Sequence, residues 1–208
     1  MYFIRTPFVF QKLFSKIIWN LPNRASVIYL TFDDGPNPET TYWILEQLEK
    51  YNANATFFCL GVNAEKYPDL IKKIIEAGHT IANHGYEHLN GWKISSEKYQ
   101  QNIIKGKEVL ETLTENEVKL FRPPYGKFKI SHHSHFQSKM ILWSLMPGDF
   151  DATISSPQCF KNISTKIKQG DIICLHDSTQ AQNHLQYCLP NWLEFIYNKG
   201  LKSENIIL

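Results

Sequence analysis

Two hydrophobic periods alternate along the chain. Short, mainly apolar runs at 27–32, 55–60 and 171–175 are bounded by turn residues and predict buried strands. Apolar residues at helical spacing, as in 96–113 and 183–198, predict amphipathic helices. Strands that alternate with helices favour parallel pairing through right-handed crossovers, and therefore a barrel or a doubly wound sheet in a single domain. Three further strands are expected at 79–83, 118–121 and 140–143.

The N-terminal part of the chain has its own helical pattern. Basic residues interrupt its apolar run, which therefore predicts neither a cleaved signal peptide nor a membrane span. We expect residues 1–24 to form an amphipathic helical extension packed on a domain of residues 25–208, in a cytoplasmic protein. The alternative is a basic amphipathic helix lying on a membrane surface, in a membrane-peripheral protein. The apolar residues at helical spacing are Phe10, Phe14, Ile17, Ile18 and Leu21.

Composition and charge narrow the class of protein. The chain has 208 residues, of which 43% are hydrophobic and 20% charged, as in a globular domain with a sizeable core. Its net charge of +2 is too small to indicate a nucleic-acid partner. The cysteines show no paired spacing, and Cys59 and Cys174 lie inside strand-like runs, where we interpret them as small buried apolar residues. We expect a monomer without a disulfide framework.

Polar residues follow the predicted strands at their carboxyl ends. In parallel α/β folds these ends meet at one face, so side chains placed there converge. Because polar residues recur at the carboxyl end of one strand after another, we expect them to form a common site and not to be scattered structural residues. The residues in question are Asp33, Asp34, His84, His88, Arg122, Asp149 and His176.

The types and spacing of these residues point to metal-assisted chemistry. His84 and His88 are four positions apart, so on a helical turn they share a face and can bind one cation. With Asp34 as a third ligand, the set has the open position of a catalytic zinc-type site. Asp33 then stays available as a base, held ionised by Arg122.

On the other side of the predicted site, His176 can supply a proton, with its ring oriented by a carboxylate such as Asp149. The histidine cluster 132–135 follows a loop and has no carboxylate or cysteine partner near it in the sequence. We therefore interpret that cluster as an ordinary surface feature in preference to a second metal site.

Five motifs stand in order along the chain: TFDDGP at 31–36, HxxxH at 84–88, RPPYG at 122–126, DF at 149–150 and LHD at 175–177. They resemble the five ordered motifs of the polysaccharide deacetylase (NodB-homology) family, and the resemblance spans roughly residues 27 to 200. It implies a distorted (β/α) barrel of about seven parallel strands. It also implies metal-dependent removal of acetyl groups from N-acetylglucosamine-containing glycans of the peptidoglycan or chitin type. One divalent ion is implied, with Zn²⁺ expected first and Co²⁺, Ni²⁺ or Mn²⁺ as alternatives.

The resemblance also assigns roles to individual residues. Asp33 resembles the catalytic base and His176 the catalytic acid. Arg122 resembles the residue that holds the base, and Asp149 the one that tunes the acid. The backbone N–H of Tyr125 resembles the group that joins the metal in stabilising the oxyanion. The metal ligands of the family match Asp34, His84 and His88.

Three departures from the family pattern concern the surroundings of these groups. Gly85 stands where a serine or threonine is usual, Phe150 where a tryptophan is usual, and Cys174 where a leucine is usual. None of them removes a reacting group, but they leave two properties undetermined by the resemblance: the affinity for the metal and the preference for the acyl group. Three alternatives therefore remain: a catalytically weakened barrel that binds carbohydrate, an O-acetyl esterase on acetylated polysaccharide, and a metal-free amidase on small ureides.

Overall fold

The protein is described by a computed structural model that covers residues 2–22, 24–129 and 138–208. Within these residues, seven strands form one curved sheet in the order β5-β4-β3-β2-β1-β6, and β7 pairs with β1. Every pairing between these strands is parallel. The predicted distorted barrel of parallel strands is confirmed. The strands are β1 (Val27–Asp33), β2 (Ala55–Cys59), β3 (Thr80–Asn83), β4 (Leu120–Phe121), β5 (Lys139–Met140), β6 (Ile172–His176) and β7 (Lys202–Ser203).

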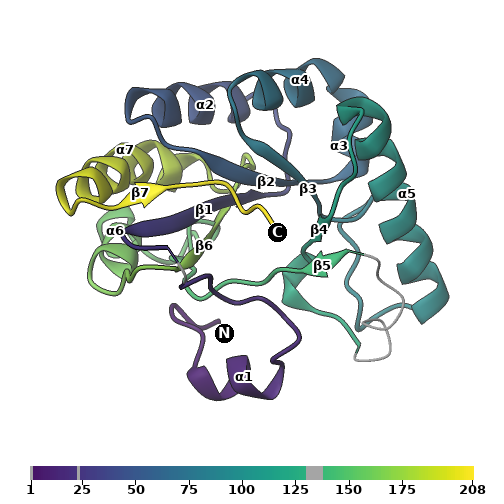
Figure 1. The fold of residues 1–208 in the computed structure, drawn as a ribbon, viewed down its shortest axis with the longest axis horizontal. Coiled ribbons are helices and arrows are strands. Elements are labelled where there is room, and N and C mark those ends of the chain that lie inside the picture. Colours follow the sequence, from purple (N-terminus) through teal and green to yellow (C-terminus); the bar gives the residue numbers. More distant parts are fainter. Residues whose placement is uncertain (1, 23, 130–137) are drawn as a thin grey trace.

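Helices cover the outer face of the sheet, as Figure 1 shows. Most of them follow a strand in the chain, which is the order that the alternating pattern predicts, whereas the first helix precedes every strand. The longest, α5, has Ser95 as its N-cap, whose side chain accepts a hydrogen bond from the amide of Lys98. The helices are α1 (Phe8–Leu13), α2 (Thr41–Lys50), α3 (Gly61–Lys66), α4 (Pro68–Glu76), α5 (Ser96–Thr114), α6 (Ser156–Ser164) and α7 (Gln182–Asn198).

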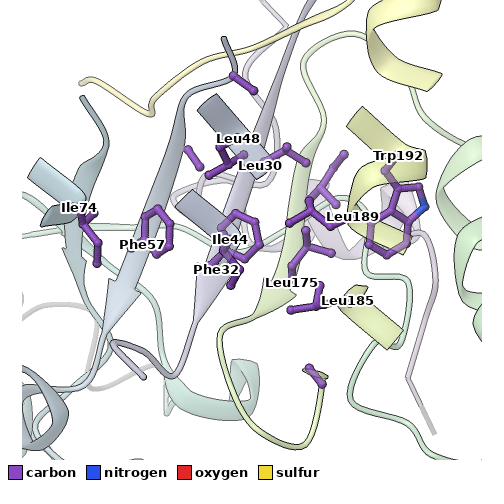
Figure 2. Close-up of a cluster of buried hydrophobic side chains, with 14 of the residues drawn as sticks. Leu30, Phe32, Ile44, Leu48, Phe57, Ile74, Leu175, Leu185, Leu189 and Trp192 are labelled. Carbon is purple, nitrogen blue, oxygen red and sulfur yellow. The ribbon is translucent and has the colours of Figure 1, made fainter. Parts of the chain in front are cut away.

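The alternation of side chains along β1 separates the core from the site. Ile28, Leu30 and Phe32 belong to the main hydrophobic cluster between sheet and helices, part of which Figure 2 shows. The alternate residues Thr31 and Asp33 face the barrel interior, because successive side chains of a strand point to opposite faces. The apolar cluster therefore fixes the strand, and the strand carries polar groups to the interior at its carboxyl end.

The barrel is irregular between β4 and β6. The strand expected at 140–143 is wrong in extent, since only its first residue lies in β5. The carbonyl oxygens of Ile141 and Leu142 accept hydrogen bonds from the Arg122 side chain, at 3.3 and 3.2 Å. Leu145 then forms an isolated parallel bridge with β6. A guanidinium group thus takes up acceptors that a continuous ladder would have used.

The N-terminal segment forms a shorter helix than its periodicity predicts. α1 has six residues, and none of its side chains is buried. Ile17 is buried, but Ile18 pairs with Ile141 in an extended conformation. The Ile18 amide donates to the oxygen of Met140, so a neighbouring strand supplies the hydrogen bonds that a longer helix would have supplied. Among the described residues, no helix combines the length and the apolar character needed to span a bilayer.

Candidate active site

Register brings polar side chains together at the carboxyl ends of β1 and β6. Asp33 pairs with His176, and Thr31 with Cys174. Asp33 is buried, and its Oδ1 accepts a 2.7 Å hydrogen bond from Nη1 of Arg122. Burial alone would raise the pKa of Asp33, but the positive charge of Arg122 holds it below its ordinary value. Asp33 is therefore an ionised carboxylate inside the barrel.

Asp34, one residue later, leaves the strand. The φ of Asp34 is 77°, in the left-handed region, so the chain turns directly after Asp33. The Oδ1 atom of Asp34 lies 3.6 Å from Nε2 of His84 and 3.3 Å from Nε2 of His88. This oxygen is buried, and no group among the described residues donates a hydrogen bond to it. Three atoms able to bind a cation thus lie close together.

His84 is held in one orientation. Its Nδ1 lies 2.8 Å from the main-chain oxygen of Arg122. A carbonyl oxygen only accepts, so Nδ1 donates to it, and Nε2 is the ring nitrogen that faces Asp34. Burial, together with the neighbouring His84, lowers the pKa of His88 to about 4, so the ring of His88 is neutral at neutral pH.

The loop from His84 to His88 is not the predicted helical turn. Gly85 has a φ of 89°, and a Cβ atom there would lie 2.7 Å from Nδ2 of Asn102. Asn102, from α5, holds this loop through its amide group. Its Oδ1 accepts from the N–H of Glu87 at 2.8 Å, and its Nδ2 donates to the Glu87 oxygen at 2.9 Å. Asn102 therefore holds this loop although Gly85 has no hydroxyl group with which to do so.

His176 is paired with Asp149. Its Nδ1 lies 3.0 Å from Oδ1 of Asp149, and its backbone N–H donates to Oδ2 of the same carboxylate at 2.7 Å. Burial alone would lower the pKa of His176, but the charge of Asp149 and the hydrogen bond to it raise the pKa to about 9. The ring of Phe150 packs edge-on against that of His176, with centroids 5.0 Å apart. His176 is thus a protonated imidazole at neutral pH.

Tyr125 packs against the second histidine of the pair. Its ring centroid is 4.3 Å from that of His88, and its φ is 59°.

A cavity of about 380 Å³ opens beside Asp34 and His88. This volume is within the range of roughly 300–1,000 Å³ that is typical of small-molecule sites. Much of its lining is polar. The lining includes Asn37, Asn63, Lys66, Tyr67, Asp177, Ser178 and Thr179.

Two contacts of the site were not predicted from the sequence. Cys174, interpreted as an apolar filler, donates its thiol hydrogen to Oδ2 of Asp33 at 3.3 Å. Asp177 is buried, accepts hydrogen bonds from the hydroxyls of Thr40 and Thr41, and donates its N–H to the main-chain oxygen of Asp33 at 2.7 Å. Asp177 follows the last predicted site residue directly, and that position was the available signal.

Asp34, His84 and His88 have the donor set of a divalent metal site. One carboxylate oxygen and two imidazole nitrogens lie within 4.8 Å of one another. The buried oxygen of Asp34 lacks a hydrogen-bond donor, and the contact of His84 with a carbonyl is the second contact that metal-binding histidines typically make. These observations fit a bound cation, and the assignment of the ligands remains a prediction.

A second group, formed by Asp33, Cys174 and His176, is equally compact. Its chemistry is less suited to a metal. Burial raises the pKa of Cys174 well above its ordinary value, so the thiol stays protonated, whereas a metal binds the thiolate. Asp33 is already bound to Arg122. The histidine cluster 132–135 lies outside the described residues.

Comparison with known proteins decides the family. The sequence model described as polysaccharide deacetylase matches residues 20–138, which is more than half of the chain. The chain belongs to the polysaccharide deacetylase family. A peptidoglycan-N-acetylglucosamine deacetylase from Bacillus cereus is 32% identical over 191 residues, with 89% of each protein covered. A chitooligosaccharide deacetylase from Azorhizobium caulinodans is 33% identical over 161 residues, with 76% of each covered.

Solved structures of the family have the same fold. The Bc1960 peptidoglycan N-acetylglucosamine deacetylase superposes with a TM-score of 0.86 at 32% identity, over 97% of this chain and 95% of that one. BA3943 from Bacillus anthracis, described as a CE4 family pseudoenzyme, has a TM-score of 0.79 at 26% identity, over 91% and 66%. The chain spans 66% of a second Bacillus cereus deacetylase and 33% of the Bacillus subtilis N-acetylmuramic acid deacetylase PdaC. Homologous deacetylases act on acetylated glycans, and deacetylases of this family are metal-dependent.

Proposed function

We propose that this protein is a metal-dependent deacetylase that removes N-acetyl groups from N-acetylglucosamine-containing glycans of the peptidoglycan or chitin type. One observation carries the proposal: a buried carboxylate oxygen of Asp34, without a donor among the described residues, faces Nε2 of an oriented His84 ring. An ionised Asp33 and a protonated His176 accompany this group. A base, an acid and a cation site are the parts of a metal-assisted amide hydrolysis.

The proposed metal ligands are Asp34, His84 and His88. Zn²⁺ is the proposed ion, because one carboxylate and two imidazoles match a catalytic zinc site with an open position. When bound there, the ion supplies Lewis acidity to the acetyl carbonyl and lowers the pKa of a water molecule. The neutral ring of His88 suits this role, since only an unprotonated nitrogen binds a cation.

Asp33 and His176 divide the proton transfers between them. Asp33 accepts a proton as water adds to the acetyl carbonyl carbon, and Arg122 keeps its carboxylate ionised until then. His176 donates the proton from its Nε2 to the amide nitrogen as the C–N bond breaks, because its Nδ1 is engaged by Asp149. The products are acetate and a free amino sugar.

The backbone N–H of Tyr125 is the proposed donor to the oxyanion that forms on the former carbonyl oxygen. The ring of Tyr125 packs against that of His88, so this residue lies next to a proposed metal ligand. We also propose a monomeric enzyme, because the proposed set of base, acid and metal ligands needs no residue from a second copy. Contact with a membrane surface is a separate proposal, because no residue of the N-terminal segment belongs to the site.

An acetate-release assay tests the function. Metal-free protein is reloaded with Zn²⁺ and incubated with chitin oligomers, with peptidoglycan fragments and with O-acetylated xylan. We expect acetate from the N-acetylated glycans, loss of release with a chelator, and loss of both zinc and activity in His84→Ala. His184→Ala, outside the site, is the matched control and should keep both.

Other outcomes would select an alternative. Glycan binding without acetate release in the zinc-loaded protein would support the weakened carbohydrate-binding barrel. The pseudoenzyme among the similar structures shows that the fold alone does not imply turnover. Release from xylan alone would support an O-acetyl esterase. Full activity in His84→Ala would contradict the ligand assignment.

A further inference from the structure

The N-terminal segment exposes a dense set of large apolar side chains. Phe8, Val9 and Leu13, all in α1, are 77%, 67% and 72% exposed. Phe3 and Phe10 are also exposed, and their rings contact each other with centroids 5.8 Å apart. We call these five residues the N-terminal patch. Figure 1 shows α1 at the edge of the molecule, apart from the helices that cover the sheet. A cluster of this kind on a folded protein marks an interaction surface.

The segments before and after α1 are both bound to the folded domain. Before α1, Arg5 binds Asp171 through Nη1 at 2.9 Å, and the Thr6 hydroxyl donates to the oxygen of Trp143 at 2.8 Å. After α1, Ile17 is buried and Ile18 is bonded to the sheet. The exposed side chains of α1 therefore belong to a turn that its two packed flanks hold outward, and not to a loose end.

The charged side chains of residues 1–32 have one sign. The first acidic residue of the chain is Asp33, whereas Arg5, Lys12, Lys16 and Arg24 precede it. The two arginines pair with Asp171 and Glu204 of the folded domain. Lys12 and Lys16 are exposed and form no ion pair among the described residues. Apolar side chains beside unpaired lysines are the recognised combination for the surface of an anionic bilayer.

We infer that the N-terminal patch inserts into the surface of an anionic lipid bilayer. Phe8, Val9 and Leu13 enter the boundary between headgroups and acyl chains, and Lys12 and Lys16 meet anionic headgroups. Six helical residues span about 9 Å, so the contact is shallow and the chain lies on the bilayer without crossing it. This contact is independent of the deacetylase site, because no site residue takes part in it.

Cosedimentation with lipid vesicles tests the inference on the full chain. Vesicles of phosphatidylcholine alone are compared with vesicles that also contain phosphatidylglycerol. We expect clear binding to the anionic vesicles, weakened by salt. The double variant Phe8→Ser/Leu13→Ser should lose about tenfold or more in apparent affinity. Lys12→Gln/Lys16→Gln should lose about tenfold and with it the preference for anionic lipid.

Matched controls carry comparable substitutions, of an apolar residue to serine or of lysine to glutamine, outside the patch. Ile104→Ser/Ile207→Ser removes two exposed apolar side chains outside the patch, and Lys72→Gln/Lys98→Gln removes two exposed lysines. Both controls should bind vesicles as the unaltered protein does. All four variants should keep its melting temperature and its rate on soluble chitin oligomers, so that failure of the proposed catalytic function is seen separately.

Two results would overturn the inference. One is vesicle binding by the unaltered protein that is no stronger than that of the serine variant of the patch. The other is concentration-dependent self-association in sedimentation equilibrium that Phe8→Ser/Leu13→Ser abolishes, without vesicle binding. That second result would assign the patch to contact between copies of this chain.

Discussion

The two adjacent carboxylates Asp33 and Asp34 lie in regions that are built in different ways. Asp33 is the last residue of β1 and is fixed between β2 and β6, with Arg122 bound to its side chain. Asp34 is outside the strand, and its neighbour His88 is on a loop that Asn102 holds. The sheet thus positions the proposed base, whereas a few loop contacts position the proposed metal ligands. Changes in the two regions should therefore affect different steps.

The largest effect is expected in the strand region. Asp33→Asn should lower kcat by about 10²–10⁴-fold, because the site loses its proton acceptor. Bound zinc should stay at one ion per chain, since Asp33 is not among the proposed ligands. Acetate release and metal content, measured on the same sample, check this pair of results. Loss of the metal together with activity would show that the two regions are not separate.

The next effect is expected in the loop region. Asn102→Ala removes both hydrogen bonds to Glu87 and should weaken zinc affinity about 10–100-fold, as loss of an outer contact typically does. With saturating zinc, kcat should return to near its original value. A competition titration with a chelator measures the affinity. Gln101→Ala, at the exposed neighbouring position, is the control and should not change it.

A smaller effect concerns the proposed acid and its pH dependence. Activity should fall as the pH rises through about 9, where His176 loses its proton. In Asp149→Asn this fall should move to lower pH, because the charge that raises the pKa of His176 is gone. A pH–rate profile of both proteins measures the difference. An unchanged alkaline limb would exclude His176 as the acid.

The same pair also links stability to pH. The folded-state pKa of His176 is raised from 6.5 to about 9. The contribution of this group to the free energy of unfolding is therefore complete below pH 6.5 and is lost as the pH rises through 9. Thermal unfolding of the metal-free protein should show this decline. The decline should be weaker in Asp149→Asn.

The smallest effect is expected at Cys174. Cys174→Leu removes a hydrogen-bond donor from Asp33, which raises the pKa of that carboxyl group and moves the acidic limb of activity to higher pH. The maximal rate should change by less than about tenfold, because no proton-transfer group is lost. An acidic limb that does not move would mean that the thiol only fills space.

Local patterns were sufficient for the features that a single strand determines. The run at 27–32 predicts β1 and the turn after it, and therefore the separate surroundings of Asp33 and Asp34. Contacts between distant segments could not be predicted in this way. The spacing of His84 and His88 suits a helical turn as well as a loop. The choice depends on α5, whose Gly106 lies so close to the loop that a Cβ atom there would come within 2.5 Å of Gly85.

The N-terminal segment shows the same limit. The spacing of Ile17 and Ile18 suits a helix, but an edge of the sheet lies within reach and binds the backbone of Ile18. The contact of Cys174 with Asp33 depends on the register of β1 against β6, which no local pattern encodes. Such pairings arise from the folded barrel as a whole.

The position of the metal tests the central claim most directly. Crystals of the zinc-loaded protein, measured at the zinc absorption edge, should show one anomalous peak within bonding distance of Asp34, His84 and His88. A peak among Asp33, Cys174 and His176, or no peak at either group in a protein that releases acetate, would contradict the account.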